Sequence, residues 1–177
     1  YVTLTASGTI GVDAATGKEL WRYEKLGRNT ANIPTPIVLG DQIFTAAGYR
    51  MGAALLTLSK DGDGISMKEE YYEGDLRNKH GGLVVVGEYV YGDSDDQGNP
   101  YCAEWKTGKI KWKRSQAKGK LKGRGSASLT YADGHLYVRY SDGWVALVPA
   151  SPTGYKEVSA FKIPNSNANS WAHPVVI

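Results

Sequence analysis

The chain has 177 residues, enough to bury a substantial core if its parts pack on one another. Its formal net charge of +3 is too small to indicate a polyanion by itself, and we expect no nucleic-acid partner. The single cysteine, Cys102, excludes an intrachain disulfide, and no apolar run reaches the about 18 residues that a membrane span requires.

The predicted elements are short strands in which apolar and polar residues alternate, and no segment keeps helical spacing over about ten residues. Three strands open the chain, at 1–6, 8–14 and 18–24. Three groups of four strands follow. Their first strands lie near 35–39, 82–86 and 126–132, their second strands near 42–46, 88–91 and 135–140, and their last strands near 65–72, 109–114 and 155–161.

Glycine turns divide these strands at a constant interval. Hairpin turns are predicted at Gly40, Gly87 and Gly134, which are 47 residues apart both times, because glycine accepts a positive φ angle without steric cost. A second set is spaced 47, 44 and 46 residues apart: Gly17, Gly64, Gly108 and Gly154. This period accommodates one small sheet and is too short for a domain, so the chain is an array of repeats.

We therefore predict an all-β fold of four-stranded antiparallel sheets, with the strands of each unit named A to D. The predicted order is BCD-ABCD-ABCD-ABCD-A, and the last strand A is 171–177, because His173-Pro174-Val175-Val176 mirrors Thr35-Pro36-Ile37-Val38. The four units of this single domain, 1–177, are 1–24 together with 171–177, 33–72, 80–114 and 125–163. A radial arrangement of such sheets leaves few exposed edges.

A turn-and-tryptophan motif recurs within the repeat. One copy has Asp13, Thr16-Gly17 and Trp21, and a second has Glu104, Thr107-Gly108 and Trp112. Weaker copies at 60–67 and 151–158 have Met67 and Val158 where the full copies have tryptophan. The pattern small-x-Asp/Glu-x-x-Thr-Gly-x-x-x-Trp resembles the tryptophan-docking repeat of the pyrroloquinoline-quinone (PQQ) type β-propellers, over the whole chain.

This resemblance implies a β-propeller whose blades are the predicted sheets. Trp21 and Trp112 are then expected to pack on the turn of the neighbouring blade, with the Thr-Gly pairs forming the turns. Propellers of this family commonly have eight blades. The four blades' worth of strands here therefore form a small closed ring, half of a dimeric ring, or a fragment of a longer chain, and we favour an incomplete ring.

In a propeller the D-to-A and B-to-C connections lie on one face, around the central channel, where ligands bind. The D-to-A connections carry the predicted ligand-binding residues Arg28, Asn29, Asn32, Arg77, Asn78, His80, Arg124, Asn167, Asn169, Trp171 and His173, together with Ser126. The B-to-C connections add Arg50 and the loop Asp93, Ser94, Asp95 and Asp96. A ligand with carboxylates, phosphate or sugar hydroxyls fits these groups. In the alternative interpretation, the loops are solvated and the asparagines cap turns.

No metal site is expected, because the three histidines lie in different repeats without ligand spacing. The Asp93–Asp96 loop has enough oxygen atoms to hold calcium, but it equally describes an exposed loop, and Asp61-Gly62-Asp63-Gly64 is expected to be a turn. The basic stretch 109–124 lacks interleaved aromatic residues and is expected to be a solvated connection.

No catalytic residue is predicted, because the sequence has no nucleophile elbow, phosphate loop or metalloprotease motif. The quinone-dependent dehydrogenases of this fold typically have a vicinal cysteine pair, which one cysteine cannot form. We therefore expect a non-catalytic binding or assembly scaffold without a cofactor, which binds a protein or a small polar ligand, or pairs as a homodimer that completes a larger ring. A location outside the cytoplasm is implied by the resemblance alone.

Two other functions stay open. The chain is alternatively part of a quinone-dependent dehydrogenase, with PQQ and calcium, whose site residues lie in further blades. As a third alternative, it is a module that recognises glycans or peptides through Trp171, His173 and the Asn-rich last connection.

Overall fold

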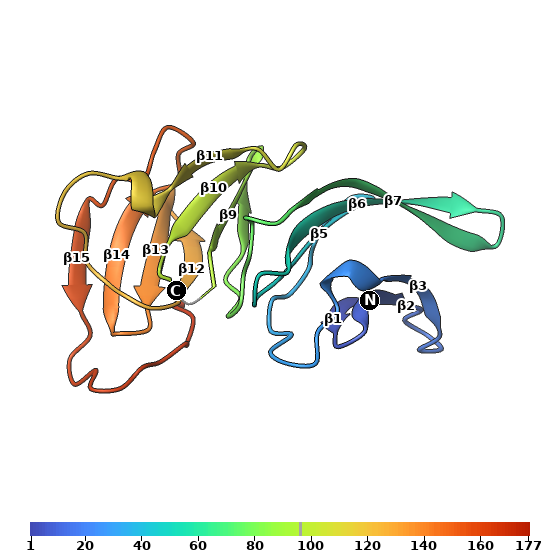
Figure 1. The fold of residues 1–177 in the computed structure, drawn as a ribbon, viewed down its shortest axis with the longest axis horizontal. Coiled ribbons are helices and arrows are strands. Elements are labelled where there is room, and N and C mark those ends of the chain that lie inside the picture. The colour runs from blue at the N-terminus through green and yellow to red at the C-terminus, as the bar shows by residue number, and fades with distance from the viewer. Residues whose placement is uncertain (96) are drawn as a thin grey trace.

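The computed structural model describes residues 1–95 and 97–177. Across these residues the chain forms fifteen strands and two one-turn 3-10 helices, arranged as four antiparallel sheets (Figure 1). The first sheet has three strands and the others have four each, so the predicted all-β fold and its repeat of strands are confirmed. No helix in this part of the chain is long and apolar enough to cross a membrane.

Each sheet is a meander in which neighbouring strands follow one another along the chain. The opening sheet contains β1 (Val2–Thr5), β2 (Gly8–Val12) and β3 (Glu19–Tyr23), and η1 (Glu24–Leu26) follows it. The second sheet contains β4 (Ile37–Leu39), β5 (Gln42–Ala47), β6 (Gly52–Asp61) and β7 (Gly64–Glu73). The third contains β8 (Val84–Val86), β9 (Tyr89–Asp93), β10 (Pro100–Glu104) and β11 (Ile110–Lys113), and η2 (Arg114–Gln116) follows it. The fourth contains β12 (Ala127–Ala132), β13 (His135–Tyr140), β14 (Trp144–Pro149) and β15 (Ser159–Lys162).

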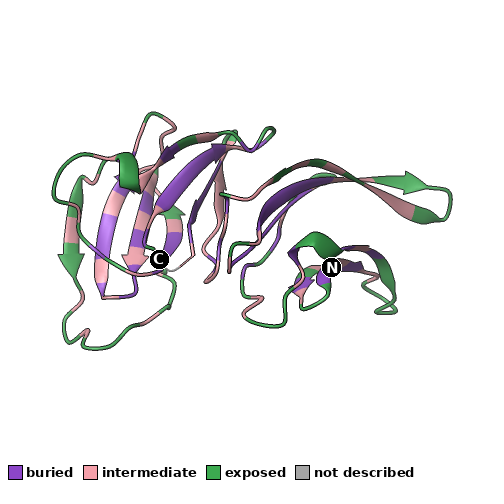
Figure 2. Ribbon diagram, viewed as in Figure 1, coloured by how far each residue is buried: buried purple, intermediate pink, exposed green. Residues whose placement is uncertain are grey.

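The hydrophobic core lies between successive sheets. Along β5, Ile43 and Ala47 pack in one cluster with Trp21 of the opening sheet, whereas Phe44 packs in another with Tyr101 of the third sheet. Alternate side chains of one strand therefore point to opposite neighbours, which is why the strand is apolar on both faces. The central strands of the array are accordingly the most buried (Figure 2).

The Asp/Glu-x-x-Thr-Gly turn has a defined hydrogen-bonding role. Asp13 Oδ1 accepts hydrogen bonds from the backbone N–H and the hydroxyl of Thr16, both at 2.7 Å, and Glu104 Oε2 accepts one from Thr107 Oγ1 at 2.8 Å. The following residues, Gly17 and Gly108, have φ angles of 72° and 69°, where a side chain is strained. The carboxylate, the hydroxyl and the glycine together close the turn between strands C and D.

The tryptophan position is marked by a β-bulge. Trp21 lies opposite Gly11, and Trp112 lies opposite Cys102, in both cases where the register shifts. In the second sheet the same register shift lies beside Leu55, which pairs with Tyr71. Tyr71 therefore takes the tryptophan position, and the assignment of Met67 to it was wrong. The strands β6 and β7 have ten residues each, so the turn that joins them lies farther from the rest of the sheet than the other turns do (Figure 1).

The fourth sheet needs a similar correction. In the third sheet Cys102 lies between Trp112 and Tyr91. Val138, which follows Tyr91 by 47 residues, is the equivalent of Tyr91 in the fourth sheet, and it pairs with Ala146. Ala146 in turn faces Ala160, so alanine, and not Val158, takes the tryptophan position there. The last full sheet thus has a small side chain where the others have a large aromatic ring.

Two of these aromatic side chains reach the turn of the next sheet. Trp112 Nε1 donates a hydrogen bond to the Ser151 carbonyl at 2.8 Å, and the Tyr71 hydroxyl donates one to the Trp105 carbonyl at 3.0 Å. Trp21 is buried in the cluster that includes Leu56 of β6, with Met67 packed against it. That these rings hold the array together stays a prediction.

The strand predicted at 171–177 is not formed. This segment lies along β12 and β13, where Ser128 Oγ and Thr130 Oγ1 donate hydrogen bonds to the carbonyls of Ala172 and Pro174, at 3.1 and 2.7 Å. Arg139 Nη1 donates another to the Ser170 carbonyl at 2.9 Å. Side chains thus bind the backbone carbonyls that a β-ladder would use. The expected pairing of this segment with the opening sheet is absent among the described residues, where β1 pairs with β2 alone.

Candidate functional site: a cationic pocket on the connection face

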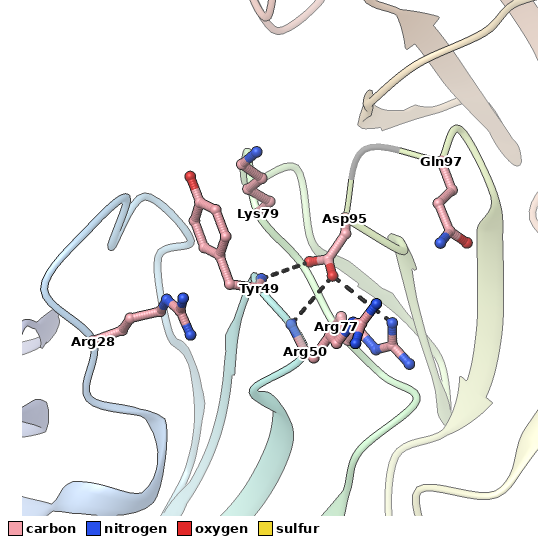
Figure 3. A pocket seen from close by; sticks show the side chains of 7 residues that line it. All are labelled: Arg28, Tyr49, Arg50, Arg77, Lys79, Asp95 and Gln97. Atoms are coloured by element: carbon pink, nitrogen blue, oxygen red, sulfur yellow. Dashed lines mark hydrogen bonds and ion pairs between the residues drawn. The ribbon is translucent and has the colours of Figure 1, made fainter.

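Four connections meet at one hollow, which we call the cationic pocket. It has a volume of about 390 Å³ and is lined by Arg28, Tyr49, Arg50, Arg77, Lys79, Asp95 and Gln97 (Figure 3). These residues come from the D-to-A connections β3–β4 and β7–β8 and from the B-to-C connections β5–β6 and β9–β10. The structure thus brings together the two classes of connection that the repeat predicts on one face.

Asp95 fixes the corner between β5 and β6. Its carboxylate accepts hydrogen bonds from the backbone N–H groups of Tyr49 at 3.1 Å and Arg50 at 3.3 Å (Figure 3). These two residues have φ angles of 56° and 70°, in the left-handed region that costs a non-glycine residue about 1 kcal/mol or more. A carboxylate from the neighbouring blade therefore stabilises a strained corner that presents Tyr49 and Arg50 to the pocket.

The Tyr49 ring organises two of the cations. The Arg28 guanidinium carbon lies 4.8 Å from the ring centroid and Lys79 Nζ lies 4.5 Å from it, and the two side chains flank the ring in Figure 3. Both distances are within the range of a cation–π interaction, in which the electron-rich ring face offsets part of the positive charge. The ring thus holds two cations near each other that would otherwise repel.

Among the described residues that line the pocket, basic side chains outnumber acidic ones. Arg77 lies 3.4 Å from Asp75 and 3.9 Å from Asp95, whereas Arg28 and Arg50 form no ion pair with any residue in the described part of the chain. Asp75 is shared with Lys113, and the hydrogen bond from this lysine is the main cause that lowers the pKa of Asp75. The arrangement therefore attracts an anion, and guanidinium groups are suited to carboxylates and phosphates.

A second hollow adjoins the cationic pocket. It has a volume of about 310 Å³, and Gln97 lines both hollows. Its other lining residues are Gly98, Asn99, Arg114, Ser115, Ala117, Gly119 and Leu121. Arg114 is held in place by hydrogen bonds to the carbonyls of Gly98, Lys122 and Gly123, at 2.8 to 3.1 Å.

Asp93 begins the acidic loop but does not reach the pocket. It is buried, its Oδ2 accepts a hydrogen bond from the Ala127 N–H at 2.7 Å, and burial raises its pKa to about 8. Within residues 1–95 and 97–177 no group of three His, Cys, Asp or Glu side chains is placed to hold a metal. Asp96, which the calcium alternative also used, lies outside the described residues.

The predicted site residues divide into groups. Arg28 and Arg77 line the cationic pocket, together with Arg50 and Asp95 from the B-to-C connections. Asn78 is buried, and its amide exchanges two hydrogen bonds with the backbone of Gly81, at 3.0 and 2.7 Å. Asn32 donates a hydrogen bond to the Arg28 carbonyl at 2.7 Å. These two asparagines thus order the connections, as the capping interpretation expects.

A second cluster forms where the C-terminal segment crosses the β7–β8 connection. Trp171 stacks on His80 with the ring centroids 5.3 Å apart, and His173 Nε2 donates a hydrogen bond to the His80 carbonyl at 2.9 Å. The remaining predicted residues are exposed and line neither hollow: Asn29, Arg124, Asn167 and Asn169. Sequence reasoning missed Tyr49, Lys79 and Gln97, and the only sign of them is the aromatic and basic composition of the Gly48–Gly52 turn and of the β7–β8 connection.

Comparison with known proteins agrees with the fold. The family model described as outer membrane protein assembly factor BamB matches residues 1–114. The crystal structure of BamB from Moraxella catarrhalis has a TM-score of 0.62 and 18% identity, and the match covers 92% of this chain but only 45% of that protein. A europium-containing methanol dehydrogenase gives a TM-score of 0.46 and 14% identity over 68% of this chain and 23% of that one.

The chain thus spans less than half the length of the BamB structure that it matches. No curated protein matches the sequence. The family model covers well over half of the chain, and the same repeat continues beyond it through the fourth sheet. The chain therefore belongs to the BamB-like family of PQQ-type repeat β-propellers.

Proposed function

We propose that this chain is a non-catalytic binding and assembly scaffold that recognises a protein partner through the connection face. The observation that carries this proposal is the cationic pocket, where the guanidinium groups of Arg28 and Arg50 lie in a hollow without an ion pair to any described residue. Unpaired cations at a concave site raise the local concentration of anionic partners and accelerate their association. A scaffold needs such a site and no reacting group.

The family description supports a protein partner and a place outside the cytoplasm, because it names an outer membrane assembly factor. We propose that location for this chain as well. A homodimer that completes a larger ring is a further part of the proposal, since β1 lacks a neighbour on one side within the described residues. The proposed location and the proposed homodimer go beyond what the family match supports, which is the fold and the repeat.

The alternative function is a part of a quinone-dependent dehydrogenase with PQQ and calcium. The chemistry of Cys102 gives that alternative little support, because the thiol is fully buried in the third sheet and burial raises its pKa to about 11. A protonated, inaccessible thiol is unreactive. We propose that the chain acts without a cofactor.

Photo-crosslinking in cells tests the proposed scaffold function. A photoreactive amino acid at Gln97, between the two hollows, is expected to give a discrete crosslinked protein band. The same amino acid at Lys60, on the exposed end of β6, serves as the control and is expected to give none. Identical patterns at both positions, or no band at Gln97, would remove the proposal.

A reconstitution assay tests the alternative. The purified chain is titrated with PQQ and calcium, binding is followed by calorimetry, and alcohol-dependent dye reduction is measured. We expect neither saturable binding nor dye reduction. Stoichiometric binding with turnover would establish the dehydrogenase alternative instead.

A further inference from the structure

We infer that the cationic pocket and the adjoining hollow form one groove for an extended, acidic peptide segment of the partner, with carboxylates beside Arg28 and Arg50 and an apolar side chain beside Leu121. This inference rests on the proposed scaffold function and names the chemistry of its partner. Four observations lead to it: the unpaired cations, their separation, the continuity of the two hollows, and the apolar end of the second hollow.

The described lining of the cationic pocket contains guanidinium groups without an acidic partner. Several basic side chains elsewhere on the chain pair with acids, as in Lys25 with Glu69, Lys68 with Glu70 and Lys111 with Glu104. In the pocket, the only acid among the described lining residues is Asp95, and its two oxygens already accept backbone N–H groups. The guanidinium forks of Arg28 and Arg50 therefore offer unmet donors to carboxylates from outside.

The guanidinium groups of Arg28 and Arg50 lie on different connections. Arg28 belongs to the β3–β4 connection and lies against the ring of Tyr49, whereas Arg50 leaves the β5–β6 corner at the next residue (Figure 3). Lys79 approaches the same ring from the β7–β8 connection. The two guanidinium groups without an ion pair to a described residue, Arg28 and Arg50, thus lie on different connections, and each can meet a separate carboxylate of one peptide.

The two hollows are continuous. Gln97 lines both hollows, so a chain lying against the cations reaches the second hollow without leaving the surface. Near Gln97, the Asp95 carboxylate binds the backbone N–H groups of the β5–β6 corner, and the Gly98 carbonyl accepts a hydrogen bond from Arg114. The groove is therefore preorganised, which lowers the entropic cost of binding an extended segment.

The far end of the second hollow is apolar. Ala117 and Leu121 line the second hollow and are half-buried against the core of the third and fourth sheets. Gly119, between them in sequence, has no neighbour within 4 Å at the place of a Cβ atom, so this side of the hollow is open. An apolar side chain of the incoming peptide would cover Leu121, and burial of apolar surface stabilises that contact.

Fluorescence anisotropy with a synthetic peptide tests the inference on the full chain. The probe is a labelled twelve-residue peptide with four spaced glutamates followed by two leucines, made in both sequence orders. One order is expected to bind saturably. The double variant Arg28→Gln, Arg50→Gln is expected to weaken binding by about tenfold or more, because two charge-assisted contacts are lost. The matched variant Lys60→Gln, Lys109→Gln has the same change in net charge away from the groove and is expected to bind like the parent chain.

Two further arms test the chemistry. A probe with glutamine in place of glutamate is expected to lose most of its binding. Leu121→Ser is expected to weaken the leucine probe about threefold or more and to leave a serine version of the probe unaffected. Circular dichroism and thermal unfolding of each variant confirm that it is folded.

The inference fails if the glutamine probe binds equally well, if the arginine variant binds like the lysine control, or if citrate displaces the probe at an equal concentration of carboxylates, which would indicate a small-anion site. If crosslinking at Gln97 persists while the probes fail, only the acidic-peptide inference is lost. If crosslinking fails as well, the proposed scaffold function is lost with it.

Discussion

Asp93 is a buried carboxyl group that the fold keeps protonated at neutral pH. Burial raises its pKa to about 8, whereas an aspartate in an unfolded chain has a pKa of about 3.9. Between these values the folded state binds a proton that the unfolded state has released. The free energy of unfolding therefore falls as the pH rises, by at most about 1.4 kcal/mol for each pH unit, and this loss ends above the folded pKa.

Asp93→Asn should remove this pH dependence. The asparagine oxygen still accepts the hydrogen bond from the Ala127 N–H, but the side chain no longer titrates. We expect the variant to gain stability relative to the parent chain as the pH rises from 4.5 to 8, as measured by urea unfolding. Asp41→Asn, in an exposed hairpin turn, is the control and should follow the parent curve. Parallel curves for Asp93→Asn and the parent would contradict the assignment of a protonated Asp93.

Gly108 and Gly17 occupy equivalent turns but have different surroundings. Both have positive φ angles, of 69° and 72°, so alanine at either position costs roughly 1 kcal/mol. A Cβ atom at Gly108 would lie 2.5 Å from the Tyr71 ring, whereas at Gly17 nothing lies within 4 Å. We expect Gly108→Ala to cost a further 1 to 3 kcal/mol, about the usual penalty of overpacking. Equal losses of unfolding free energy would mean that Tyr71 does not cover this turn.

At the scale of elements, Trp112 joins strand β11 to the next sheet. It is 4% exposed, it packs against Tyr91 and Tyr155, and its indole N–H reaches Ser151. Trp112→Ala and Trp21→Ala should each reduce the free energy of unfolding by about 3 to 5 kcal/mol, as buried aromatic truncations do. Trp171→Ala is the control, because Trp171 is 51% exposed and its loss should cost less than about 1 kcal/mol. Losses of a few tenths at Trp112 would show that the ring is not a structural contact.

Most elements were predictable because local patterns decide them. The alternation of apolar residues, the hairpin glycines and the Asp/Glu-x-x-Thr-Gly turn are all local, and the sheets follow from them. Met67 was wrongly assigned to the tryptophan position because the length of the β6–β7 hairpin depends on pairing between two ten-residue strands. The sequence of the turn motif does not indicate this length. The segment 171–177 has the composition of a strand, but a strand needs a partner with free N–H and C=O groups, and hydroxyl donors of β12 bind its carbonyls instead.

The candidate site was predicted only in outline, for a related reason. The convergence of Arg28 and Arg77 follows from the repeat, because equivalent connections share one face. The role of Tyr49 depends on cations from two other connections, and the role of Asp95 depends on backbone N–H groups 45 and 46 residues away in sequence. Such contacts between connections cannot be read from the composition of any one loop.

At the scale of the whole molecule, stability is expected to be uneven along the array. The opening sheet has three strands and packs against one neighbouring sheet, whereas β9 and β10 lie between two cores and are almost entirely buried. In stacked repeats each unit is stabilised mainly by its neighbours. The N–H groups of β1 to β3 and of the outer strand β15 should therefore exchange with solvent faster than those of β5, β6, β9 and β10.

Hydrogen exchange followed by mass spectrometry measures this difference directly. If the chain is monomeric, the fast exchange of the opening sheet should not change with protein concentration. If a second copy covers β1, this exchange should become slower as the protein concentration rises. Uniform protection across all four sheets at low concentration would contradict the picture of an array stabilised by its neighbours.

Asp95 binds the backbone N–H groups of Tyr49 and Arg50, and this affects how the surface can change during evolution. The carboxylate holds the main chain of the corner, so its bonds do not depend on which side chains the two residues carry. Side chains that tolerate a positive φ angle can therefore be exchanged at positions 49 and 50 while the carboxylate holds the main chain of the loop. Relatives with the same carboxylate are free to diverge in what they recognise, and a library randomised at these two positions is a natural starting point for selecting new binders.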